Sequence, residues 1–161
     1  MSELFFLLIE SMKEEAACYR RLALLARDQK ELLIAGNVDA LPENIRLQEK
    51  QVFALTPIIG RREDLLIKLA KISGLKKMNL EEAAKIVSAD VSENFKSTLS
   101  HLIVSAKELA SVHELSGKLL DNAVAYNNFT MKAIRRGGKK KSFSNAVAPE
   151  DKKPSFVNRV V

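Results

Sequence analysis

The chain has 161 residues and a mass of 17.9 kDa, which is the size of a single domain. Apolar residue types make up 47% of it, whereas 6 Gly and 4 Pro provide too few tight turns for a β-sandwich or barrel. Residues 132–161 contain nine Lys or Arg and two Asp or Glu (net +7), so the overall charge of +6 leaves residues 1–131 at −1. The composition predicts an all-α body that is nearly neutral, followed by a basic tail.

The first predicted helix covers residues 3–34, because apolar side chains recur there with a helical period and no Gly or Pro interrupts them. Gly36 is suited to the left-handed residue that ends a helix, and Asp39 can cap the next one. The stripe comprises Phe5, Leu8, Met12, Tyr19, Leu22, Ala26 and Leu33.

A second helix is predicted over residues 41–73, with Pro42 in its first turn. Its apolar positions alternate by four and three residues over four heptads, which is the spacing of a coiled-coil seam. Two polar members, Gln48 and Arg62, are of the kind that fixes packing register. The seam comprises Leu41, Ile45, Gln48, Val52, Leu55, Ile59, Arg62, Leu66 and Leu69.

Two further helices follow the Gly74 break. Asn79 is a capping residue for a short helix over 80–88, and a long helix is predicted over 92–134. The predicted fold is therefore all-α: an elongated antiparallel bundle, or coiled coil, of three long helices and one short helix within residues 1–136.

The last segment, residues 137–161, loses the helical period and begins with Gly137-Gly138-Lys139-Lys140-Lys141. Its Ser, Asn, Pro and charged residues predict a disordered basic tail, because they bury too little apolar surface to offset the entropy of ordering. Hydrophobic residues at Phe143, Val147, Phe156-Val157 and Val160-Val161 are either incidental or part of a short motif that folds onto a partner.

Chemistry-bearing residues do not form a recognisable catalytic, cofactor-binding or metal site. His101 and His113 lie about 120° apart on a helix, so they cannot share a metal ion. Cys18 is the only cysteine and has no neighbouring histidine that would activate it. Ordinary solvated helix surface explains the adjacent acidic pairs Glu14-Glu15, Glu63-Asp64 and Glu81-Glu82.

The cellular compartment is predicted from the same observations. A single cysteine allows no intrachain disulfide, and the apolar run Leu4–Ile9 lacks the basic leader and the cleavage site of a signal peptide. Since no run approaches the length of a membrane span, the chain is expected to be cytoplasmic.

The second helix contains the segments Leu47-Gln-Glu-Lys50 and Ile58-Ile-Gly-Arg-Arg-Glu-Asp-Leu-Leu66. It is followed by Gly74-Leu75 and then by Asn79-Leu-Glu-Glu82. This order of elements resembles the FlgN family of flagellar type III export chaperones. Leu115-Ser-Gly-Lys-Leu-Leu120 is similar to that family's Asn-Gly-x-Leu-Leu segment, and Ser155–Arg159 to its short hydrophobic-basic ending. Many members carry Tyr-Gly-x-x-Gly after the last helix, thought to engage the export gate, where this chain has Ser142-Phe-Ser-Asn145.

The resemblance implies a non-enzymatic cytoplasmic chaperone without a cofactor. Such proteins bind hook–filament junction proteins (the FlgK and FlgL type) by their C-terminal segments, prevent premature assembly and deliver them to the export gate and ATPase. The resemblance places client binding at the end of the last helix and in the tail, and it is compatible with a weak homodimer. The candidate residues are Leu120, Val124, Asn127, Met131, Ile134, Phe143, Phe156, Val157 and Val160.

Two alternatives follow from the residues alone. A structural coiled-coil or oligomerisation protein would use the seam of the second helix for self-association. A nucleic-acid or membrane-surface binder would use the basic run ending in Lys139–Lys141, although no stacking aromatics accompany that run.

Overall fold

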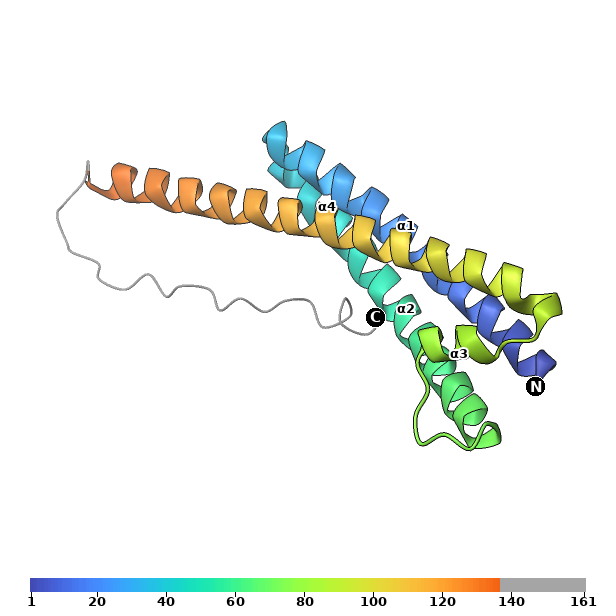
Figure 1. Cartoon of the computed structure of the whole chain (residues 1–161). Coiled ribbons are helices and arrows are strands. Elements are labelled where there is room, and N and C mark those ends of the chain that lie inside the picture. Colours follow the sequence, from blue (N-terminus) through green and yellow to red (C-terminus); the bar gives the residue numbers. More distant parts are fainter. Residues whose placement is uncertain (137–161) are drawn as a thin grey trace.

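A computed structural model describes the backbone of residues 1–136 and the side chains of residues 1–114. It contains the helices α1 (Ser2–Ile34), α2 (Leu41–Ile72), α3 (Leu80–Ile86) and α4 (Ala89–Arg136), with a short 3-10 turn, η1, at Val38–Ala40 (Figure 1). The described residues form helices and no strand, so the predicted all-α class is confirmed. The predicted tail, residues 137–161, lies outside the described residues.

The two long N-terminal helices end where glycine permits a left-handed backbone. Gly36 has φ +68° and Gly74 has φ +71°. The N–H of Asn37 donates to the carbonyl of Leu32 at 2.9 Å, and the N–H of Leu75 donates to that of Ala70 at 2.9 Å. These bonds satisfy carbonyls that have no partner inside a helix, so both sequence-predicted ends are confirmed.

The short helix α3 begins with a complete capping box. The Glu82 N–H donates to the Asn79 side-chain oxygen, and the Asn79 N–H donates to the Glu82 carboxylate, both at 2.8 Å. Val87 is extended, and the helix therefore ends at Ile86, earlier than residue 88. The Ser88 carbonyl accepts from the N–H of Val91 and from that of Ser92, which starts α4 at Ala89 instead of residue 92.

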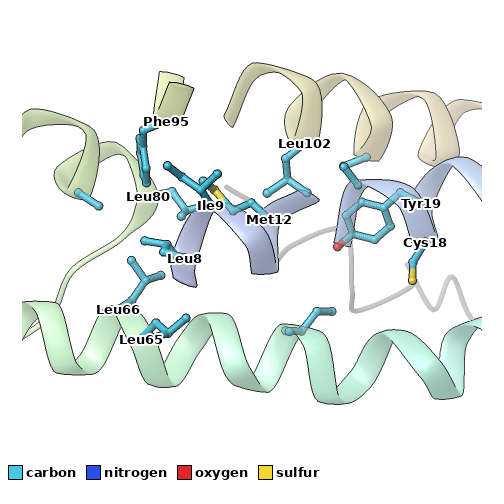
Figure 2. Packing of buried hydrophobic residues seen from close by; sticks show 14 of the residues in the cluster. Leu8, Ile9, Met12, Cys18, Tyr19, Leu65, Leu66, Leu80, Phe95 and Leu102 are labelled. Atoms are coloured by element: carbon cyan, nitrogen blue, oxygen red, sulfur yellow. The ribbon is translucent and has the colours of Figure 1, made fainter. Parts of the chain in front are cut away.

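Helix α1 lies between α2 and α4 (Figures 1 and 2). The Asn44 side chain donates to the Leu25 carbonyl at 2.9 Å, whereas the Ser11 hydroxyl donates to that of Ile58 at 3.3 Å, so α2 runs antiparallel to α1. On the other side, α4 runs parallel to α1 and antiparallel to α2. In the described residues, the backbones of α2 and α4 both pack on α1 but do not pack side by side.

The core follows the apolar stripe of α1. Phe5, Leu8 and Met12 are fully buried. Figure 2 shows side chains from both flanking helices around Leu8 and Met12. The Phe5 ring meets the Phe95 ring of α4 edge to face, with 5.8 Å between their centroids. One long helix therefore supplies the shared middle layer of the bundle.

The seam predicted on α2 is buried only in part. Leu41, Leu55, Ile59, Arg62, Leu66 and Leu69 are buried and Gln48 is half-buried, but Ile45 and Val52 are 38% and 41% exposed. The seam is therefore buried along only part of its length. Because α1 is the only long helix packed directly along α2 in the described residues, it covers one edge of the stripe and leaves the other open.

Candidate functional site

The C-terminal part of α4 extends past the other helices (Figure 1). The Arg27 guanidinium is paired with the Glu108 carboxylate, and the last residue of α1 is Ile34, seven positions after Arg27. Because α1 and α4 are parallel, α1 ends beside about residue 115 of α4. The backbone of α4 continues as a helix to Arg136, about 30 Å further.

The sequence-predicted client-binding residues fall into two groups. Leu120, Val124, Asn127, Met131 and Ile134 lie on this extension of α4, and their alternating spacing of four and three residues is that of a helix-pairing stripe. Phe143, Phe156, Val157 and Val160 lie outside the described residues. The extension thus provides the helical backbone that the first group requires.

A buried polar cluster joins α1 to α2 in the middle of the core. The Tyr19 hydroxyl donates to Glu15 Oε1 at 2.8 Å, and Arg62 Nε lies 3.2 Å from Glu15 Oε2. All three side chains are almost completely buried. Arg62 therefore acts as a polar register residue of the predicted seam, because it meets its countercharge at only one alignment of α1 with α2.

The sequence prediction for Glu15 was wrong, because this residue is buried and not on a solvated face. Its neighbour Glu14 is half exposed and pairs with Arg61 at 3.0 Å. The available signal was position: Glu15 comes three residues after Met12 and four before Tyr19, so it lies on the apolar stripe. An acidic residue on such a stripe requires a buried cation or a neutral form.

Burial raises the pKa of the Glu15 carboxyl above its ordinary 4.5, although Arg62 and the Tyr19 hydroxyl both lower it. The folded state therefore holds the proton more tightly than the unfolded state. The stabilisation of the folded state that comes from this proton is fully present below the pKa of Glu15 in the unfolded chain. It is lost as the pH rises through the higher pKa of Glu15 in the folded chain.

We expect Glu15→Gln to remove this part of the pH dependence. Urea unfolding from about pH 4 to about pH 8 measures the free energy of unfolding of both proteins across the window. As the pH rises, the unaltered chain should lose free energy of unfolding relative to Glu15→Gln. Glu14→Gln is the control, and its profile should lack this shift. A shift of opposite sign would show that Arg62 outweighs burial.

The described side chains include one cysteine, Cys18, and several residues of the types that bind metal ions. Cys18 is buried, and this burial raises the pKa of its thiol, which disfavours the nucleophilic thiolate. Within residues 1–114, no three His, Cys, Asp or Glu side chains gather in a group that would hold a metal ion. Within the described residues, none of the helices is long and apolar enough to cross a membrane.

The family model of the FlgN protein matches residues 1–146, which include all four described helices. The chain belongs to the FlgN family. Proteins of the FlgN family are chaperones of flagellar export and not enzymes. Membership of the family implies the same general role for this chain. Comparisons with curated proteins and with solved structures gave no match.

Proposed function

We propose that this chain binds unassembled hook–filament junction proteins of the FlgK and FlgL type in the cytoplasm. It captures their C-terminal segments, prevents premature assembly and aggregation, and delivers them to the type III export apparatus. The observation that carries the proposal is the FlgN-family match over residues 1–146. The extension of α4 beyond α1 supports it by offering helical backbone that α1 does not accompany.

The physical reason lies in the client. A segment that later enters a coiled coil carries an apolar stripe that aggregates when it is left exposed. A helix with its own apolar stripe can cover that segment in a surrogate coiled coil. The stripe from Leu120 to Ile134 spans two heptads, which is a suitable length for such a contact.

The tail is assigned to capture and transfer. Phe143, Phe156, Val157 and Val160 are spaced anchors in a polar, basic segment, and folding of such a segment on its partner offsets part of the binding energy. Release then requires no ATP hydrolysis by the chaperone. Phe143 is the proposed counterpart of the tyrosine that engages the export gate in the family.

The first test substitutes the α4 extension. Met131→Glu places a charge on the proposed contact stripe and is expected to weaken binding of a labelled junction-protein C-terminal segment about 30-fold. Phe129→Glu is the matched control, because residue 129 is about 200° around the helix from position 131. Fluorescence anisotropy titration gives both dissociation constants, and the control should stay within about twofold of the unaltered chain.

A second variant ends at Arg136 and lacks the tail. We expect it to lose affinity about 100-fold while circular dichroism retains the helical signal of residues 1–136. Equal affinities for Met131→Glu, Phe129→Glu, the shortened chain and the unaltered chain would contradict the proposed binding site. Absence of binding by the unaltered chain would contradict the proposed function itself.

A further inference from the structure

A pocket of about 320 Å³ lies between α2, the segment that begins α3, and α4. Its walls are largely apolar, and Arg62 of the buried cluster also lines it. Because α2 and α4 both pack on α1 and not on each other, their facing edges leave this space open. We call it the α2–α4 groove; its apolar lining comprises Leu66, Met78, Leu80, Leu99 and Ile103.

The α2 wall continues beyond the pocket along one heptad stripe. Ile45, Val52, Ile59 and Leu66 are spaced by seven residues, and Leu66 lines the groove itself. Leu66 and Ile59 are buried, but Ile45 and Val52 remain exposed. The most regular apolar repeat of the sequence is therefore left half covered by the fold, and its last member, Leu66, lies in the groove.

The α4 wall has the matching pattern. Leu99, Ile103, Ala106 and Ala110 are spaced by four, three and four residues. Leu99, Ile103 and Ala110 are half-buried, and Ala106 is buried. Leu66 of the first stripe and Leu99 and Ile103 of the second line the groove. Two partly covered heptad stripes that meet in one groove form the kind of surface into which an amphipathic helix places its apolar residues.

The rim of the groove carries charges of both signs, contributed by different helices. Glu63 of α2 and Glu81 of α3 are exposed acidic residues of its lining, and Lys107 of α4 is an exposed basic one. None of these three takes part in an ion pair within the described side chains. This arrangement selects a helix with basic residues on the flank toward α2 and α3 and acidic residues on the flank toward α4.

We propose that the α2–α4 groove is a second contact site for the client and binds an amphipathic helix of its C-terminal segment. The bound helix places an apolar heptad stripe against Val52, Leu66 and Ile103, with its charged flanks complementary to the rim. This inference rests on the proposed function and adds a surface on the body of the molecule to the α4 extension. The stripe from Ile45 to Leu66 is about 32 Å long, which corresponds to a helix of about 20 residues.

The chain's own tail fits the groove less well. The sequence of residues 137–161 contains Pro149 and Pro154 and has no heptad repeat, which is not the pattern of an amphipathic helix of this length. A second copy of the chain is the other alternative occupant, and the test below separates it from the client.

The test compares two neighbouring exposed residues of α2 in the full chain. Val52→Glu places a charge on the groove stripe, and Phe53→Glu places the same charge about 100° around the helix, at a side chain that is 85% exposed. The probe is the purified, fluorescein-labelled C-terminal segment of the junction protein from the same organism. We expect Val52→Glu to weaken binding at least about 10-fold and Phe53→Glu to change it less than about twofold.

Charge reversal provides an independent readout. Glu63→Lys and Lys107→Glu are each expected to weaken binding about threefold to tenfold at low salt, and less at high salt. Circular dichroism checks that every variant keeps the helical content of the unaltered chain.

Each result has a distinct meaning. If the unaltered chain binds the probe and Val52→Glu binds it with equal affinity, the groove assignment is overturned and the proposed function stands. No binding by the unaltered chain overturns both. Sedimentation equilibrium measures whether the unaltered chain forms a dimer that Val52→Glu dissociates. If it does, and the affinity for the client stays constant, the groove belongs to a second copy of the chain and the client assignment is overturned.

Discussion

Replacing Arg62 by alanine is expected to lower the free energy of unfolding by about 3–5 kcal/mol at neutral pH. The guanidinium lies 3.2 Å from the Glu15 carboxylate, and both side chains are nearly inaccessible to water. Without Arg62 the carboxylate either stays charged in an apolar interior or takes up a proton at a pH where protonation is unfavourable. Both outcomes destabilise the folded state.

The loss should depend on pH in a defined direction. At low pH the Glu15 carboxyl is protonated in the folded state and no longer requires a countercharge, so the effect of Arg62→Ala should be smaller there than at neutral pH. Urea unfolding at both pH values measures it.

Arg61→Ala is the matched control for this prediction. Arg61 is the neighbouring residue, and it pairs with Glu14 at 3.0 Å on the surface, where both side chains are about half exposed. Exposed ion pairs contribute about 1 kcal/mol or less, so this variant should stay close to the unaltered chain. Equal losses for Arg61→Ala and Arg62→Ala would contradict a buried pair between α1 and α2.

Replacing Phe95 by alanine is expected to cost about 3–5 kcal/mol, because the ring is fully buried and its removal leaves a cavity. Phe95 contacts Phe5 edge to face across the α1–α4 interface, which adds an aromatic contribution to the area that it buries. Thermal and urea unfolding should both show the loss as a lower midpoint.

Phe6→Ala is the control for the aromatic contact. Phe6 is adjacent to Phe5 on α1, yet 52% of its side chain is exposed. A truncation at an exposed position away from the core typically changes stability by about 0.5 kcal/mol or less. A loss of several kcal/mol for Phe6→Ala would place Phe6 at a contact that the fold does not explain.

The helices could be predicted from the sequence because their signals are local. Gly36 and Gly74 supply the left-handed residue at a helix end, and Asn79 supplies a cap three residues before Glu82. Each signal acts within about one turn of the chain, so no distant contact can reverse it easily. The stripe on the α4 extension was predictable for the same reason, since its spacing is a property of one helix.

The bounds of α3 and α4 differ from the predicted ones by two or three residues, whereas the larger differences concern contacts between helices. An adjacent acidic pair is usually solvated, and only the packing of α2 on α1 placed Glu15 in the core while leaving Glu14 outside. In the same way, a heptad repeat predicts that Ile45 and Val52 are covered, but it does not identify which helix covers them. The fold leaves both of them exposed.

The class of fold, the four helices, the glycine-bounded ends of α1 and α2, and a resemblance to a family of export chaperones could all be predicted from the amino-acid sequence. Local backbone preferences and apolar periodicity are enough for these features. Three features became visible only in the packed molecule: α1 is the shared middle helix, Arg62 pairs with Glu15, and a groove lies between α2 and α4. These features depend on which helix faces pack together, and that choice is made by the fit of many side chains from distant parts of the chain.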